Sequence, residues 1–276
     1  MGQYSLMDSL QSANNSRFTS SATAVMPDHS AEVIPALAST LRTGSEKAQL
    51  KAVQQLAAMG EPGYRALMDF LRERRPALLG AVGDSGEQAP ANLPISLVAG
   101  NVYQFLFDSE FEPAIEFLQI EFPDGIVPLR TDHGIDYAPL QKLLAQQYFQ
   151  AADQMTLQKL CELAGTQAVQ RKWLYFTEVE QFPITDLRTV NTLWLVHSEG
   201  RFGFSVQREL WLSVGKNWDK LWEKINWKTG NNWTRYPEEF TWDLTAPRGH
   251  LPLSNQLRGV RTFASLLAHP AWSATM

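Results

Sequence analysis

Apolar residues recur at helical spacing along most of the chain, which predicts a mainly α-helical protein. The first three predicted helices carry these apolar stripes: Val33, Leu37 and Leu41; Leu50, Val53 and Leu56; and, after a turn at 60–63, Tyr64, Leu67, Phe70 and Leu71. A helix, a turn and a helix together resemble one unit of a helical repeat. Only one such unit is clear, so the pattern favours a small amino-terminal helical bundle.

Segments rich in proline and glycine divide the chain. Residues 78–94 have few bulky side chains and are predicted to form a long loop, with further helices at 95–108 and 112–122. The run FPDGIVPLRTDHGIDYAPL at 122–140 interrupts helix with repeated prolines and glycines, so we place the domain boundary within it. The prediction is a disordered tail over 1–30, a helical bundle over 31–130, and a core with a carboxy-terminal tail over 131–276.

The second half continues in helices. Periodic runs predict helices at 137–150 and 151–164, and Asp186 is the expected N-cap of a helix that ends at His197. Ser205 is expected to cap the next helix, and Gly215 to interrupt the tryptophan-rich run that follows. Strand signals are few, and the clearest is the short alternation at 239–244.

Composition and charge narrow the class of protein. The chain has 276 residues, 44% of them hydrophobic, and a formal net charge of −5, which argues against general nucleic-acid binding. The charge is uneven: residues 1–150 hold 10 basic and 17 acidic side chains, whereas residues 151–276 hold 14 and 12. Cys161 is the only cysteine and lies on an apolar helical face, which indicates a buried structural thiol.

Motifs of catalysis and metal binding are not evident. The segment GRFGF at 200–204 lacks the flanking strand and the Lys-Ser/Thr of a phosphate loop, and the histidines do not have metal-ligand spacing. We interpret His197 as a helix-end histidine hydrogen-bonded to nearby backbone, and His250 as a structural residue in a turn. The sequence therefore predicts a protein that is not an enzyme and has neither a metal site nor a covalent cofactor.

Aromatic surface beside arginine is the strongest chemical signal. All nine tryptophans lie between Trp173 and Trp272, and from Ala246 onward the chain has three arginines and no acidic residue. Apolar walls rimmed by guanidinium groups suit a flat molecule with carboxylate arms. Composition alone favours the alternative that most tryptophans fill the core and the arginines are solvated. The candidate wall and rim residues are Trp218, Trp222, Trp233, Asn255, Arg258 and Arg261.

Four sequence runs in the second half resemble a known family. They are AADQMT at 151–156, FPITDLRTVNTLW at 182–194, GRFGFSVQ at 200–207 and APRGHLP at 246–252. In order and content they are similar to the Genomes-Uncoupled-Four family, the porphyrin-binding regulators of magnesium chelatase in chlorophyll synthesis. Asn191 departs from the pattern, since the family usually has aspartate there.

The resemblance implies an all-helical core shaped like a cupped hand, which holds protoporphyrin IX or magnesium-protoporphyrin IX. In this chain the ligand-lining positions implied by the family are Val169 and Phe176 in a loop, and Asn255, Arg258 and Arg261 in the tail. The implied protein partner is the large porphyrin-binding subunit of magnesium chelatase.

The implied location is the cytoplasm of a cyanobacterium, partly peripheral to the thylakoid membrane, or alternatively the chloroplast. Two other functions stay open: a tetrapyrrole sensor or interaction module without a chelatase role, and a carbohydrate hydrolase that uses tryptophan platforms.

Overall fold

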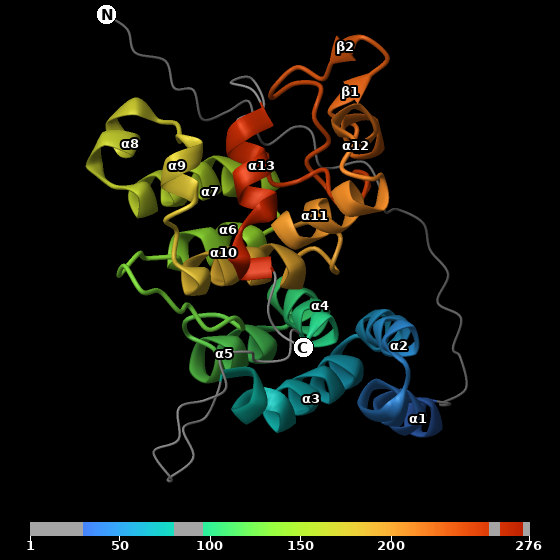
Figure 1. The fold of residues 1–276 in the computed structure, drawn as a ribbon. Coiled ribbons are helices and arrows are strands. Elements are labelled where there is room, and N and C mark those ends of the chain that lie inside the picture. The colour runs from blue at the N-terminus through green and yellow to red at the C-terminus, as the bar shows by residue number, and fades with distance from the viewer. Residues whose placement is uncertain (1–29, 80–95, 254–259, 273–276) are drawn as a thin grey trace, which may run out of the picture.

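The computed structural model describes residues 30–79, 96–253 and 260–272. Within these residues the chain forms α-helices joined by turns, with one two-stranded antiparallel hairpin (Figure 1). The predicted mainly helical class is therefore confirmed. The tail expected over 1–30 lies outside the described residues except for Ser30, as does the loop expected at 78–94 except for its first two residues, which end a helix.

Three helices form the amino-terminal part: α1 (Ser30–Thr43), α2 (Glu46–Ala58) and α3 (Glu61–Leu79). The Ser45 hydroxyl caps α2 by accepting a hydrogen bond from the Ala48 N–H at 3.4 Å. α3 begins at Glu61, inside the turn predicted at 60–63. Pro62 is tolerated in the first turn of a helix, because the N–H that proline lacks would have no intrahelical partner there. Most predicted stripe residues are buried, whereas Val33 near the start of α1 is 41% exposed.

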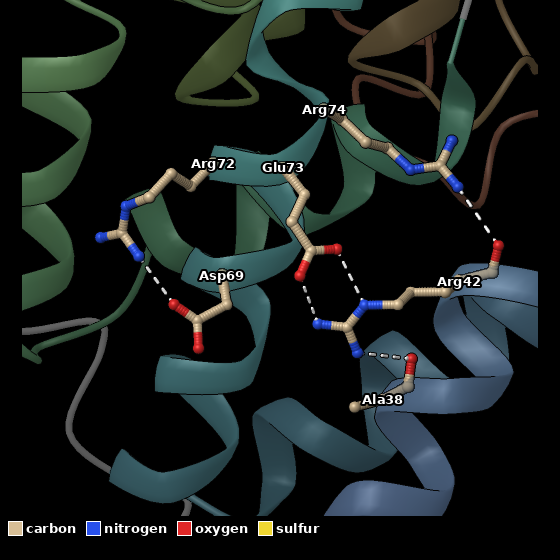
Figure 2. A network of polar contacts seen from close by, with 6 residues as sticks. All are labelled: Ala38, Arg42, Asp69, Arg72, Glu73 and Arg74. Carbon is tan, nitrogen blue, oxygen red and sulfur yellow. Dashed lines mark hydrogen bonds and ion pairs between the residues drawn. The ribbon is translucent and has the colours of Figure 1, made fainter.

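A group of charged side chains joins α1 to α3 (Figure 2). Arg42 donates two hydrogen bonds to the Glu73 carboxylate, at 2.8 and 2.7 Å, and Arg74 donates to the Arg42 carbonyl at 3.3 Å. Arg72 pairs with Asp69 within α3 at 2.7 Å. Because these groups are largely solvent-exposed, each pair is worth at most about 1 kcal/mol, so the network orients the two helices more than it stabilises them.

Helix α4 (Leu97–Phe107) connects the two parts of the molecule. It packs against α2 and α3 on one side and against α10 (Ile184–Val196) on another, and most of its residues are buried. Gly100 allows this close approach, since a Cβ at that position would lie 2.4 Å from the Val196 carbonyl oxygen. α5 (Glu112–Glu121) packs against α3 and α4. The bundle and the core thus remain in contact, and their separation into two domains near residue 130 stays a prediction.

The segment between α5 and α6 is fixed by a buried carboxylate. Asp186 accepts hydrogen bonds from the Thr131 hydroxyl at 2.6 Å, the Asp132 N–H at 2.9 Å and the Tyr137 hydroxyl at 2.9 Å. The prediction that Asp186 is an N-cap is wrong, because Pro183 occupies that position. The carboxylate instead binds the segment between α5 and α6, which we call the linker. The family-like run at 182–194 therefore has a structural role at this point.

The remaining elements form the core: α6 (Ala138–Ala145), α7 (Phe149–Ala164), α8 (Thr166–Arg171), α9 (Phe176–Val179), α11 (Phe204–Ser213), α12 (Trp218–Lys224), β1 (Lys228–Thr229), β2 (Asn232–Trp233), α13 (Val260–Ala268) and the 3₁₀ helix η2 (Pro270–Trp272). The predicted break at Gly215 is confirmed by the gap between α11 and α12. The predicted capping by Ser205 is wrong: Gly203 is the N-cap, and the Asn191 side-chain oxygen accepts the Ser205 N–H at 2.9 Å.

The strand predicted at 239–244 is also wrong. Backbone and side-chain donors of that segment bond elsewhere: the Thr241 N–H donates to His250 Nε2 at 3.2 Å, and the Trp242 indole donates to the Pro237 carbonyl at 2.9 Å. The hairpin forms instead at 228–233, where Gly230 has a φ of +58°. A glycine in this conformation suits a two-residue hairpin turn, a signal that the sequence contained.

Candidate functional site

Four tryptophans of α11, α12 and the following turn stack in series. Ring centroids are 5.0 Å apart for Trp211 and Trp218, 5.2 Å for Trp218 and Trp222, and 5.5 Å for Trp222 and Trp227. Phe263 of α13 packs against the last three of these rings at 5.9, 5.6 and 5.3 Å. Such offset contacts add to the free energy gained by burying the rings. We call these five residues, together with Trp233, the aromatic stack.

The stack is partly core and partly surface. Trp227 is fully buried and Trp222 is 4% exposed, so Trp222, a predicted ligand-wall residue, lies inside the stack. Trp218 is half-buried, and Trp233, 5.9 Å from Trp222, is 44% exposed. A ligand reaching the stack would therefore meet Trp218 and Trp233 first. Trp222 and Trp227 therefore follow the alternative interpretation, in which tryptophans fill the core.

Helix α13 also carries the one predicted arginine that the structure describes. The Arg261 guanidinium lies 5.8 Å from the Phe176 ring centroid, so two predicted site residues are brought together. α13 is fixed to the α9 region by hydrogen bonds from Thr262 to the Leu174 carbonyl, at 3.3 Å, and from Ser265 to the Phe176 carbonyl, at 3.2 Å.

The two predicted parts of the site lie on different sides of α13. Arg261 and Phe263 are two positions apart in a helix, which turns their side chains to roughly opposite sides. Figure 1 shows the same separation, with α8 and α9 on one side of α13 and α12 with the hairpin on the other. Val169 lies on α8 and is 42% exposed. Asn255 and Arg258 lie outside the described residues.

Three of the family-like runs converge just before the segment that holds Asn255 and Arg258. Asp153 accepts the Leu253 N–H at 2.6 Å, and the Gly203 N–H donates to the Leu251 carbonyl at 3.0 Å. Gln207 donates to the Pro252 carbonyl at 2.8 Å and to the Gly249 carbonyl at 3.0 Å. We call Asp153, Gly203 and Gln207 the tail clamp. It fixes where the chain leaves the core before residue 254.

The chain is fixed again where it rejoins the core at α13. Arg208 of α11 donates to the Leu267 carbonyl at 2.6 Å, and Arg188 of α10 donates to the Ala271 carbonyl at 3.2 Å. The described residues on both sides of 254–259 are therefore held by the core. The sequence did not single out Asp153, although a carboxylate inside a helical run was a visible signal.

Burial changes the protonation of two core groups. Burial raises the pKa of the Asp153 carboxyl to about 8, while the hydrogen bond from the Leu253 N–H lowers it. Burial lowers the pKa of His197 to about 4. Within the described part of the chain neither ring nitrogen of His197 has a hydrogen-bond partner. The expected backbone bond of His197 is therefore wrong, although its position at the end of α10 is confirmed.

His250 behaves as predicted for a structural residue in a turn. Its Nδ1 lies 2.7 Å from the Ile225 carbonyl oxygen, and its Nε2 accepts the Thr241 N–H. Burial lowers its pKa, and the contact with the Ile225 carbonyl raises it. Cys161 is buried, as predicted, and burial raises the pKa of its thiol to about 11. The described residues contain no cluster of three or more His, Cys, Asp or Glu side chains suited to a metal ion.

None of the described helices combines the length and the apolar composition needed to cross a bilayer. The fold and the site define a helical protein in which an amino-terminal group of helices joins an aromatic core with an arginine near its surface. Residues 130–270 match the sequence family described as GUN4-like, and residues 26–83 match an ARM-like repeat domain described as GUN4-N terminal. The chain belongs to the GUN4-like family.

The second match concerns the amino-terminal helices. Its description agrees with the helical-repeat interpretation of residues 31–71, for which the sequence had favoured a small bundle. Residues 84–129, which include α4 and α5, lie between the two matched regions.

Some relatives match most of the chain, and others match about half of it. A Ycf53-like protein of Synechocystis is 54% identical over 86% of this chain and 95% of its own length. A chloroplastic protein of Arabidopsis thaliana named tetrapyrrole-binding protein is 38% identical over 49% of this chain and 54% of its own length. The solved structure of GUN4 from Chlamydomonas reinhardtii is 41% identical, covers 53% of this chain and 96% of that chain, and has a TM-score of 0.50.

Proposed function

We propose that this protein binds protoporphyrin IX and magnesium-protoporphyrin IX without catalysing a reaction, and that it activates magnesium chelatase in chlorophyll biosynthesis. The observation that carries the proposal is the arrangement around α13. Phe263 of this helix packs within the aromatic stack, and Arg261 of the same helix contacts Phe176. The helix directly follows the segment with Asn255 and Arg258.

The chemistry of these groups suits a tetrapyrrole. The solvent-accessible parts of half-buried Trp218 and exposed Trp233 offer apolar surface, and a porphyrin ring gains free energy when such surface is removed from water. Arg258 and Arg261 would donate charge-assisted hydrogen bonds to the two propionates. Val169 on α8 would contact the ring edge, so the ring would have to lie across α13, with the aromatic stack on one side of this helix and Val169 on the other (Figure 1). The name of the Arabidopsis relative supports the same ligand class.

An absorbance titration with deuteroporphyrin tests the binding. The wild-type protein should shift the Soret band in a saturable way. Arg258→Ala and Arg261→Ala should each weaken binding roughly ten- to a hundredfold, since a charge-assisted hydrogen bond contributes about 1.5–3 kcal/mol. Arg65→Ala, in an exposed pair with Glu61 on α3, is the matched control and should bind as the wild type does. Wild-type affinity in both tail variants would reject the arginine rim.

A reconstituted magnesium chelatase tests the activity. The proposed partner is the enzyme's large porphyrin-binding subunit, and activation requires only that the bound protein favour a productive state of the enzyme. Coupling of about 1–3 kcal/mol would give several-fold to hundredfold stimulation, largest when magnesium or substrate is limiting. Stimulation and porphyrin affinity should fall together in Arg258→Ala. Stimulation that survives loss of porphyrin binding would favour the alternative of an interaction module.

We further propose that the protein acts in the cytoplasm of a cyanobacterium or in a chloroplast, partly at the thylakoid surface. The relatives from Synechocystis and from a chloroplast support both locations. Fractionation into soluble and thylakoid pools, with porphyrin added or withheld, would measure what share of the protein lies at the thylakoid surface.

A further inference from the structure

An open groove lies far from the aromatic stack, between α5 and α6. It has a volume of about 760 Å³, and Tyr103 and Phe107 of α4 are among its lining residues. Figure 1 places α5 at the opposite end of the molecule from α12 and the hairpin. The groove is therefore separate from the proposed tetrapyrrole site.

Both walls of the groove are helix faces. On the α5 side the lining residues are Ile115, Leu118, Gln119 and Phe122, and on the α6 side they are Ala138, Gln141, Lys142 and Ala145. Each set follows the i, i+3, i+4, i+7 spacing of one helical face. Such faces normally pack against another helix, yet Ile115 remains 40% exposed. On the α6 face, the small Ala138 side chain is exposed.

Acidic side chains outnumber basic ones around the groove. Residues 108–124, which include all of α5, contain six acidic side chains and no basic one. Asp124 and Asp136 line the groove itself, and Lys142 is the only basic residue among its lining residues. Of the α5 acids, Glu121 is paired with Arg75 at 3.2 Å, whereas Glu112 and Glu116 are exposed. An anionic tetrapyrrole or an anionic lipid surface would be repelled here.

We propose that this groove binds a basic amphipathic helix of a partner protein. The helix would place its apolar face between α5 and α6, against Ile115 and Phe107. Its lysines or arginines would lie beside Glu112, Glu116 and Asp136. This is helix-in-groove recognition, in which apolar anchors at helical spacing provide affinity and the charged rim provides orientation. The inference does not depend on the proposed function, because no residue of the aromatic stack takes part.

Fluorescence anisotropy with the full-length protein tests the proposal. The probe is a labelled peptide of about five helical turns, built from Leu, Ala and Lys with the leucines on one helical face. One control peptide has the same composition with the leucines distributed around the helix, and another has Glu in place of Lys. Only the basic amphipathic peptide should bind, with a Kd in the micromolar range and weaker binding at high salt.

Variants locate the binding. Ile115→Lys should weaken binding at least about tenfold by removing an apolar anchor, and Ala138→Phe should do the same by filling the groove. Leu212→Lys on α11 is the matched control, because Leu212 is 43% exposed and remote from the groove, and it should leave binding unchanged. Circular dichroism checks that each variant is folded, and deuteroporphyrin binding should be unaffected in all three.

Several results would overturn the proposal. One is equal binding of the acidic or the scrambled peptide, and another is wild-type affinity in both groove variants. Absence of binding of the basic amphipathic peptide up to about 1 mM would also overturn the proposal, because any binding free energy would then be weaker than about 4.1 kcal/mol. Binding of phosphatidylglycerol vesicles that is lost in Ile115→Lys would identify a lipid surface as the occupant instead.

Discussion

Asp153 illustrates how a single carboxyl group couples stability to pH. Its pKa is raised by burial from 3.8 to about 8. Between these values the folded protein keeps a proton that the unfolded chain has lost, so the free energy of unfolding should fall as the pH rises through this window. The loss is on the order of a few kcal/mol.

Asp153→Asn should remove this pH dependence. The amide oxygen can still accept the Leu253 N–H, so the tail clamp should persist while the titrating group is gone. Urea unfolding should be measured at a mildly acidic and at a mildly alkaline pH. As the pH rises, the urea midpoint of the wild type should fall relative to the midpoint of Asp153→Asn. Parallel curves for the two proteins would contradict the prediction. Asp153→Ala, which leaves the Leu253 N–H without its acceptor, should be less stable at every pH.

His197 should change stability with pH in the opposite direction to Asp153. Because its pKa is lowered from 6.5 to about 4, the unfolded chain binds a proton that the folded protein excludes, and stability should fall as the pH falls through this window. His197→Leu also removes two buried nitrogens that lack partners among the described residues. We expect a gain of about 1 kcal/mol near neutral pH and a larger gain at about pH 5. If His197→Leu is less stable than the wild type at the lower pH, the packing of the His197 ring against Tyr103 contributes more than the burial of its nitrogens costs.

At the scale of elements, α8 is the segment best suited to move when a ligand binds. It has six residues, it follows the break at Gly165, and both Val169 and Tyr175 nearby are more than 40% exposed. At its end, two hydrogen bonds from Arg171 to Glu178, at 2.7 and 2.6 Å, join α8 to α9. Opening of α8 would have to break its packing against α7, where Ala168 is buried, so the motion should be limited to this one short helix.

Hydrogen exchange with deuteroporphyrin measures this motion. Amides of residues 165–176 should exchange more slowly at saturating ligand, because Val169 and Phe176 would then cover the ring. Amides of α2 are the internal control and should not change. If exchange at 165–176 is the same with and without ligand, α8 is not a flap.

At the scale of the whole molecule, the bundle and the core share α4 but not the candidate tetrapyrrole site. The stack, the clamp and α13 all lie beyond residue 150. Removing the bundle takes away the partner of α10 and exposes Val196 and His197, so the core should lose stability before it loses ligand affinity.

A fragment of residues 130–276 should therefore fold and bind deuteroporphyrin within about threefold of the full chain, with a lower melting temperature. It keeps the Thr131 hydroxyl that bonds Asp186, whereas a fragment starting at Asp132 lacks it and should be less stable by about 1 kcal/mol. A folded 130–276 fragment that does not bind deuteroporphyrin would show that the bundle contributes to the site.

Local patterns in the sequence determined the helical class and most helix positions. Apolar spacing predicted α2 and α3, and Gly215 marked a break, because periodicity and backbone preference act over a few residues. Motif content alone was enough to indicate the family. The family resemblance also grouped Arg261 with Phe176, two residues that lie close together in the fold.

Tertiary structure decided which side chain meets which. Asp186 looked like a cap, yet it binds the linker, and Asp153 looked like an ordinary helical residue, yet it holds Leu253, 100 positions away. Trp222 and Trp233 look alike in sequence, but one is buried and the other exposed. Contacts between distant segments depend on how helices pack, and hydrophobic periodicity does not encode the partner of a polar group.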